Sequence, residues 1–300
     1  MFEPDQVLLG ITPTGWTNDD LPGLGAEIPY EQCLSEIALA GFDGCSLGHT
    51  FPRDPVVLGE ALRLRGLRIS EPWVSTYFTA REMRERTVAE FVRRMDFLQA
   101  LGGAGGEADL VVAELGGAVH QQPVNLRANR PRLDDRGWKE LTDGLDELGA
   151  LAAERGRRLC YHPHMGTVVQ DRSDIDRLMA ATDPSLVHLL LDTGHLSWAG
   201  GDPVDLVRDH GPRIGHVHLK DLRAEVLAEA GESSFLQAVL AGVFTVPGDG
   251  AIDFVPVLRA LALTGYRGWL TVEAEQDPAK AHPLTYALKA RGYLREVAGL

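Results

Sequence analysis

The chain alternates between short apolar runs and longer amphipathic stretches. Eight runs have the length of strands and end in turn residues or polar side chains, and they span residues 7–11, 43–47, 67–73, 110–114, 157–161, 187–191, 214–219 and 267–272. Most are apolar at consecutive positions, which is typical of strands buried on both faces. The amphipathic stretches predict helices over residues 30–40, 55–65, 81–100, 134–155, 203–209 and 279–297, one more opened by Ser173, and another near 224–241 in a long loop.

Strands that alternate with helices predict parallel strands joined by right-handed crossovers. Eight such units within 300 residues predict an α/β protein, a (β/α)8 TIM barrel formed as a single domain by residues 1–300. An open doubly wound sheet is the alternative, but no GxGxxG follows the first strand to favour a dinucleotide-binding fold. Three long loops, residues 12–29, 115–133 and 221–250, would lie on the barrel face that carries active sites.

The net charge and the cysteine content of the chain limit the kinds of molecule that it is expected to bind and the compartment in which it is expected to function. The net charge of −14 disfavours nucleic acid and anionic membrane surfaces, which need a basic footprint, and leaves small ligands and divalent cations open. The three cysteines show no CxxC spacing and predict buried, reduced thiols. The first residues predict no signal peptide and no apolar run reaches about 18 residues, so a cytoplasmic protein without a membrane span is expected.

Metal-binding residue types stand at the ends of the last three predicted strands. Asp192 follows Leu189–Leu191. His218 ends the next strand, 26 residues after Asp192, and Glu273 ends the last strand, 55 residues after His218. The ends of parallel strands meet at one rim, so these side chains are expected to share a site. One imidazole and two carboxylates predict an open catalytic site for Mn, Co, Fe or Mg. The alternative is that each residue only caps a helix or satisfies the barrel rim.

Further histidines and one lysine stand close to these strand ends. His162 and His164 flank a proline after the fifth strand, and alternation would point both toward the mouth as a fourth ligand or as acid and base. His195 is expected to bind substrate or support the ligands, and Lys220 to act as an acid or electrophile. His216, two residues before His218, is expected one layer deeper in a structural role.

Another group of residues suits a polyhydroxylated ring. Trp16 and Asn18 follow the first strand, Glu71 and Trp73 end the third, and Glu114 ends the fourth. Aromatic faces pack against carbon rings, and amide or carboxylate edges bind hydroxyls. These five residues are therefore candidates for substrate binding, with a purely structural role as the alternative for each.

With these residues assembled, the chain resembles the xylose-isomerase-like barrel superfamily of sugar isomerases and epimerases. The resemblance rests on LLLDTGH (189–195), HVHLKD (216–221), PGDGAIDF (247–254) and VEAE (272–275). Within that superfamily the chain is similar to the inosose dehydratases of myo-inositol catabolism, through GITPTGWTNDD (10–20), YHPHMGTVVQ (161–170) and residues 243–254 and 269–293. These segments span nearly the full chain.

The resemblance implies a divalent metal ion, Mn or Co, at Asp192, His218 and Glu273, with His162 in the place of the fourth ligand. It departs from the epimerases in one respect, because their fifth strand ends in a glutamate and this one ends in His162-Pro163-His164. A base and an acid of different kinds suit proton removal followed by loss of hydroxide.

The implied activity is therefore that of a lyase, a metal-dependent dehydratase that converts inosose (2-keto-myo-inositol), a small cyclic ketone, to 3D-3,5/4-trihydroxycyclohexane-1,2-dione. Glu273 or His164 would remove the proton, and Lys220 or His195 would protonate the departing hydroxyl. The alternatives are a ketose isomerase or epimerase, a metal-dependent nuclease, which the charge disfavours, and a non-catalytic sugar-binding protein. A homo-oligomer remains open.

Overall fold

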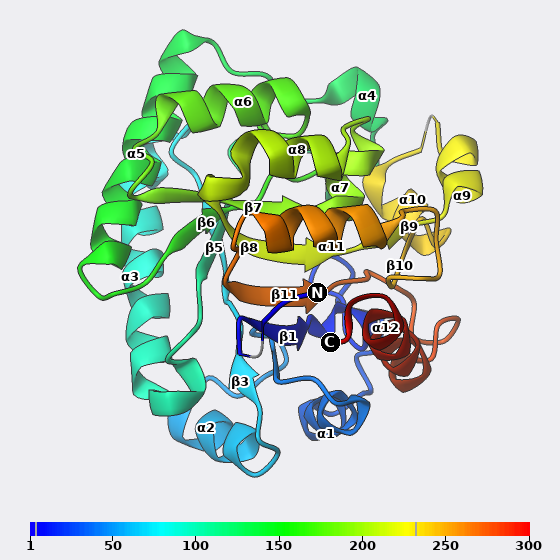
Figure 1. Cartoon of the computed structure of the whole chain (residues 1–300). Helices are drawn as coiled ribbons and strands as arrows, with labels where there is room; N and C mark the ends of the chain where they lie inside the picture. The colour runs from blue at the N-terminus through cyan, green and yellow to red at the C-terminus, as the bar shows by residue number, and fades with distance from the viewer. Residues whose placement is uncertain (4, 232) are drawn as a thin grey trace.

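The computed structural model describes residues 1–3, 5–231 and 233–300. Its parallel strands form one curled sheet in the order β3-β2-β1-β11-β8-β7-β6-β5-β4 (Figure 1). This arrangement confirms the expected TIM barrel. The strands are β1 (Val7–Ile11), β2 (Gly44–Cys45), β3 (Arg68–Ile69), β4 (Trp73–Thr76), β5 (Leu110–Glu114), β6 (Leu159–Tyr161), β7 (Val187–Asp192), β8 (Ile214–Leu219) and β11 (Gly268–Val272).

The third predicted strand is split into β3 and β4, and together these two pieces close the barrel. β3 pairs with β2, whereas β4 pairs with β5 on the other side. Pro72 stands between the pieces and has no N–H to donate to a ladder. The segment still pairs on both sides, because Leu47 N–H donates to Glu71 O at 2.8 Å and Asp109 N–H donates to Ser70 O at 3.0 Å.

Helices surround the barrel, as the amphipathic stretches predict (Figure 1). The prediction that Ser173 opens the helix after the fifth predicted strand is wrong, because Asp171 caps that helix, α6, and forms a capping box with Asp174. The surrounding helices are α1 (Tyr30–Ala40), α2 (Pro55–Arg63), α3 (Arg84–Ala100), α5 (Asp135–Ala153), α6 (Arg172–Ala181), α8 (Pro203–His210), α11 (Phe254–Leu263) and α12 (Pro283–Ala298), with 3-10 turns η1 (Pro13–Gly15), η2 (Arg81–Met83), η3 (Gly102–Gly105) and η4 (Gly211–Arg213).

Short elements gather at the end of the barrel to which the strands point (Figure 1). They are α4 (Leu126–Asn129), α7 (Thr193–Trp198), α9 (Ala224–Glu229), α10 (Phe235–Leu240) and the antiparallel pair β9 (Asp221–Leu222) and β10 (Phe244–Thr245). Phe235 and Phe244 are fully buried in a second apolar cluster beneath this cover. The long loop after β8 thus holds two short helices between a pair of short antiparallel strands, where the sequence predicts one helix.

Alternation along β7 determines which side chains enter the barrel. Leu189 and Leu191 belong to the large core shared with the helices, whereas Leu190 packs inside the barrel with Val111 and Cys160. Asp192, two residues after Leu190, has the same orientation as Leu190 because side chains alternate along a strand. The apolar run LLL therefore places the first polar residue after it at the inner rim of the barrel.

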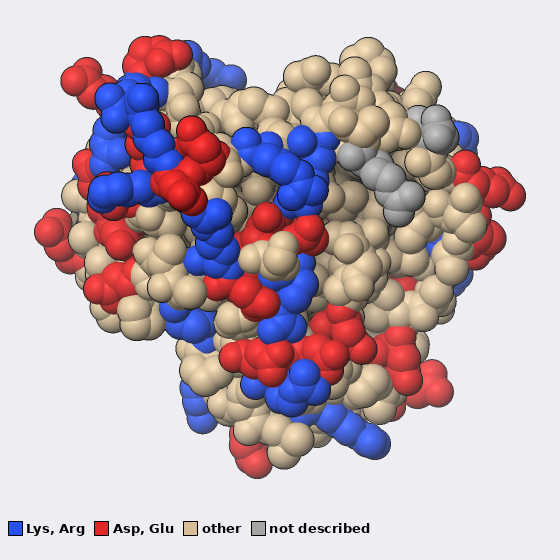
Figure 2. Space-filling model, turned by 90° about the horizontal axis from the view of Figure 1, so that it is seen from above, with Lys and Arg blue, Asp and Glu red and all other residues tan. Residues whose placement is uncertain are grey.

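Ion pairs join neighbouring helices on the surface seen in Figure 2, where acidic and basic side chains lie side by side. Arg177 on α6 pairs with Asp135 on α5 at 2.7 Å, and Arg172 pairs with Asp209 on α8 at 2.7 Å. Exposed pairs of this kind contribute little stability individually. Among the described residues, no helix combines the length and apolar character needed to cross a membrane.

Candidate active site

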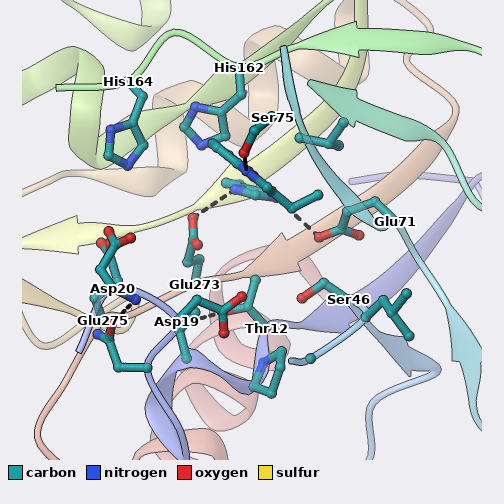
Figure 3. Close-up of a pocket in the computed structure, with 18 of the residues that line it drawn as sticks. Thr12, Asp19, Asp20, Ser46, Glu71, Ser75, His162, His164, Glu273 and Glu275 are labelled. Carbon is teal, nitrogen blue, oxygen red and sulfur yellow. Dashed lines mark hydrogen bonds and ion pairs between the residues drawn. The ribbon is translucent and has the colours of Figure 1, made fainter. Parts of the chain in front are cut away.

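A cavity of about 260 Å³ lies at the C-terminal mouth of the barrel. Its wall includes His162, His164 and Glu273, which face the same space in Figure 3. The loops after β1, β2 and β5 supply the remaining wall, through residues such as Asn18, Ser46 and Gln121. The cavity thus lies where the sequence places the ends of the strands.

Four buried side chains meet at this mouth: His162, Asp192, His218 and Glu273. They come from the ends of β6, β7, β8 and β11, which are consecutive in the sheet. The register places Asp192 directly opposite His218. One potential ligand atom from each residue lies within 4.8 Å of those of the others. His218 Nδ1 is 2.7 Å from Glu273 Oε2 and 3.7 Å from Asp192 Oδ2, and Asp192 Oδ2 is 3.5 Å from His162 Nε2.

The orientation of these atoms fits a bound cation. Asp192 Oδ2, His218 Nδ1 and Glu273 Oε2 are buried, and although they lie close to one another and to Lys220, none forms a well-oriented hydrogen bond among the described residues. His162 Nδ1 lies 2.9 Å from Pro163 O, so its N–H points to that carbonyl and Nε2 is left to accept. Buried polar atoms without a well-oriented hydrogen bond are rare, and two imidazoles with two carboxylates suit a divalent transition metal. The four side chains therefore fit a divalent metal ion, and their assignment as ligands remains a prediction.

The surrounding charges keep the two carboxylates ionised. Burial opposes the charged form of Asp192, but the Lys220 ammonium holds the pKa of its carboxyl well below the usual value. Burial likewise opposes the charge of Glu273, and Lys220 and His218 lower its pKa. Burial also opposes protonation of His218, but the neighbouring carboxylates raise its pKa well above the usual value. The cluster therefore attracts positive charge strongly.

A second cluster adjoins the first and contains Lys220, His195, His164 and Glu275. Lys220 Nζ lies 2.8 Å from Glu275 Oε2, 3.1 Å from Glu273 Oε2 and 3.0 Å from His195 Nε2. Burial opposes the ammonium form, but Asp192, Glu273 and Glu275 raise the pKa of Lys220. Lys220 is therefore an ammonium group enclosed by carboxylates.

The two histidines of this second cluster are neutral. Burial and the neighbouring positive groups hold the pKa of His164 and of His195 well below the usual value. His164 Nδ1 lies 2.9 Å from Met165 O, which leaves Nε2 free to accept a proton. Burial raises the pKa of Glu275 to about 7, although Lys220 lowers it. Glu275 and His164 line the cavity, whereas Lys220 and His195 lie behind them, 1% exposed.

Three of the five predicted substrate-binding residues line the cavity: Asn18, Glu71 and Trp73. Trp73 packs edge-on against the rings of His162 and His164. Asn18 Oδ1 accepts from the N–H groups of Asp20 and Leu21 at 2.9 Å, which fixes the loop after β1.

The structure places the other two candidates, Trp16 and Glu114, away from the cavity. Trp16 is buried in the core, and its Nε1 donates to Glu36 Oε2 at 2.7 Å. Glu114 accepts from the N–H groups of Phe78 at 3.0 Å and Thr79 at 3.1 Å, so its carboxylate orders the loop after β4. Both side chains form hydrogen bonds within the protein, which agrees with the purely structural role given as the alternative for each.

Sequence reasoning missed Glu275 and the pair Asp19–Asp20, all of which line the cavity. Glu275 follows Glu273 by two residues in VEAE, and the period of a strand was the signal available for it. Asp19 Oδ1 lies 2.5 Å from His49 Nδ1, and Asp20 Oδ1 accepts from Gln121 Nε2 at 2.7 Å. The loops after β1, β2 and β5 thus meet at these two aspartates.

The chain belongs to the xylose isomerase-like TIM barrel family, whose family model matches residues 34–297. Its curated relatives have a more narrowly defined activity than the family as a whole. It is 52% identical over 303 aligned residues to an inosose dehydratase of Geobacillus thermodenitrificans (strain NG80-2) and 50% identical to one of Bacillus thuringiensis (strain Al Hakam), with all of each chain covered. Among solved structures, an IOLI protein with a bound zinc atom shares the fold at a TM-score of 0.70 and 17% identity, over 97% of this chain and 98% of that one.

Proposed function

We propose that the protein is a hydro-lyase that removes water from inosose, a small polyhydroxylated cyclic ketone, to give a trihydroxycyclohexane-1,2-dione. Full-length identity of 52% to an inosose dehydratase supports this substrate. The observation that carries the chemistry is the convergence of three buried atoms, Asp192 Oδ2, His218 Nδ1 and Glu273 Oε2, which form no well-oriented hydrogen bond among the described residues and lie beside the ammonium of Lys220.

We infer that the metal ion is Mn or Co, held by His162, Asp192, His218 and Glu273. When bound, such an ion polarises a ketone and acidifies the neighbouring carbon-bound hydrogen. Two nitrogen and two oxygen donors favour these metals over Ca, which prefers a larger set of oxygen ligands. The IOLI protein, which shares the fold, binds zinc, and elemental analysis of the purified protein distinguishes zinc from Mn and Co.

Two side chains are suited to remove the proton next to the ketone. Glu273 is a carboxylate whose pKa is lowered despite its burial, and it faces the cavity. His164 also faces the cavity and is a neutral imidazole with Nε2 unprotonated. We assign the proton removal to Glu273, with His164 as the base if Glu273 is held too tightly as a ligand.

Protonation of the departing hydroxyl uses the second cluster. Lys220 is the proton donor by charge, but it reaches the cavity through Glu273 and Glu275, with which it forms ion pairs at 3.1 and 2.8 Å. Glu275 lines the cavity 2.8 Å from Lys220 Nζ. We therefore propose that Glu275 contacts the leaving hydroxyl and that Lys220, with His195 beside it, supplies the proton.

The experiment that tests this function uses the purified, metal-loaded protein with inosose as substrate. The expected result is an ultraviolet absorption band from the enolised dione, which a chelated sample does not produce. A product that is an epimer of the substrate, with no dehydrated species, would instead establish the epimerase alternative. Wild-type protein that leaves inosose unchanged with every transition metal tried contradicts both.

A further inference from the structure

A row of polar groups, buried from Asp109 inward, crosses the barrel and ends on the metal cluster, the four predicted ligands His162, Asp192, His218 and Glu273. It begins with Arg158, whose guanidinium binds both oxygens of Asp109 at 2.9 and 3.2 Å. Asp109 Oδ2 lies 2.9 Å from His216 Nδ1. His216 Nε2 lies 3.3 Å from Glu71 Oε2, and Glu71 Oε1 lies 3.2 Å from His218 Nε2. This row of contacts thus links Asp109 and Arg158, which directly precede β5 and β6, to His218, a predicted ligand at the end of β8.

The last link fixes the orientation of His218. A metal ion displaces the proton of the nitrogen that it binds, so a metal-bound imidazole carries one N–H, and the partner of that N–H decides which nitrogen faces the metal. His218 Nε2 faces the Glu71 carboxylate, an acceptor, and His218 Nδ1 faces Asp192 and Glu273. The contact with Glu71 therefore favours the proton on Nε2 and leaves the Nδ1 lone pair directed at the cluster.

Glu71 presents little surface to a substrate hydroxyl. The side chain is only 2% exposed. Its Oε1 faces His218, and its Oε2 faces His216, which is itself held by Asp109 and by Thr271 Oγ1 at 3.1 Å. Both carboxylate oxygens therefore face ring nitrogens, although Glu71 forms part of the cavity wall.

We propose that Glu71 is a positioning residue: it holds His218 with the proton on Nε2 and Nδ1 toward the metal, and His216 and Asp109 hold Glu71 in place. This differs from the substrate-binding role expected from the sequence. The inference rests on the proposed metal site but not on the reaction that the site performs. Carboxylates that orient a ligating histidine contribute about 10–100-fold to metal affinity.

Metal affinity measured without substrate tests this directly. Calorimetric titration of Mn²⁺ into chelated protein should show binding roughly 10–100-fold weaker in Glu71→Ala than in wild type. The loss in Glu71→Gln should be smaller, because the amide oxygen still accepts from Nε2–H but carries no charge. Asp109→Asn should weaken binding less than Glu71→Ala, since it acts through two further residues.

Glu114→Gln is the matched control, because Glu114 is also buried at a strand end but binds loop N–H groups outside the metal cluster. Its metal affinity should equal that of wild type. Unchanged affinity in Glu71→Ala together with a raised KM for inosose would overturn the inference and restore the substrate-binding role. Complete loss of binding in Glu71→Gln would make Glu71 a ligand and overturn the inference as well.

A measurement on the wild-type chain avoids any dependence on variant folding. In zinc-loaded protein labelled with ¹⁵N-histidine, His218 should show a protonated Nε2 and a metal-bound Nδ1. The opposite assignment overturns the inference whatever the variants do. A protein that passes both tests but makes no dione would refute the dehydratase proposal and leave the role of Glu71 intact.

Discussion

A Cβ atom added to Gly194 would lie 2.6 Å from Cγ of Lys220, closer than non-bonded carbons approach. Gly194 lies in α7, the helix that begins directly after Asp192. The Lys220 side chain is packed against this helix, 1% exposed, with Nζ 4.5 Å from the centre of the Phe244 ring. The glycine of LDTGH therefore allows the buried lysine to reach the carboxylates.

Gly194→Ala should for this reason reduce activity more than stability. Alanine favours a helix by about 1 kcal/mol over glycine, which offsets part of the cost of moving Lys220. We expect kcat for dehydration to fall at least about tenfold, because a misplaced proton donor costs more than one kcal/mol in the transition state. Steady-state kinetics and thermal melting of both proteins check this; a variant with full kcat would show that the position of Lys220 is unimportant.

Lys220→Met should separate the two chemical steps. Loss of the ammonium should lower dione formation by about 10²–10⁴-fold, the usual contribution of a general acid. Exchange of the hydrogen next to the ketone should persist, because Glu273 remains to remove it. Nuclear magnetic resonance of inosose in heavy water reports both steps in one sample.

Glu273→Gln is the companion variant, and it should lose exchange and dione formation together, because the first step fails. The order of effects is the informative result. Exchange that is abolished in Lys220→Met and kept in Glu273→Gln would reverse the two assignments.

Removal of the metal should abolish activity and lower the melting temperature. The folded chain brings potential ligand atoms of His162, Asp192, His218 and Glu273 within 4.8 Å of one another, and the unfolded chain does not, so the folded state binds metal more tightly than the unfolded state. An ion at 100 times its dissociation constant stabilises the fold by about 2.7 kcal/mol. Mn or Co should restore activity and melting temperature better than Ca. In Asp192→Asn, added Mn or Co should restore less activity and raise the melting temperature less than in wild type. Full activity in a sample shown by elemental analysis to be metal-free contradicts the prediction.

A pH dependence of stability is expected at the start of α6. Burial opposes the charge of Asp171, but hydrogen bonds from Ser173 and the Arg130 guanidinium, 2.6 Å away, lower its pKa. A lowered carboxyl pKa contributes stability above the unfolded-state pKa of about 3.9, and the contribution is lost as the pH falls through the folded-state pKa. Asp171→Asn keeps a good capping side chain but removes this charge. Urea unfolding should show the variant destabilised at pH 7 and the difference reduced near pH 3; a constant difference would refute the electrostatic cause.

The sequence predicts most of the barrel because its signals are local. The apolar run before Asp192 and the glycine after α1 fix a strand and a helix end without reference to the rest of the chain. The break at Pro72 was not predicted, because the run over residues 67–73 gives no indication that its two halves pair with different neighbours.

The site was predictable where strand order determines proximity. Asp192 and His218 are opposite each other in neighbouring strands, so their meeting follows from the register. Glu71 and Trp16 required knowledge of partners distant in sequence: Glu71 faces two histidines of β8, and Trp16 faces Glu36 of α1. Side-chain direction in an irregular loop depends on such partners, and residue type alone does not supply them.

The strands that carry the four predicted ligands, β6, β7, β8 and β11, are consecutive in the sheet, whereas much of the rest of the cavity wall follows β1, β2 and β5. The predicted metal ligands therefore lie on one half of the barrel, and many of the residues that could contact the rest of the substrate lie on the other half. The loops that meet at Asp19 and Asp20 can diverge, lengthen or be exchanged without altering the four predicted ligands, as long as Leu47 still donates to Glu71 O. This division gives evolution, and a protein engineer, a way to offer the same proton chemistry to a differently hydroxylated ketone by rebuilding only one half.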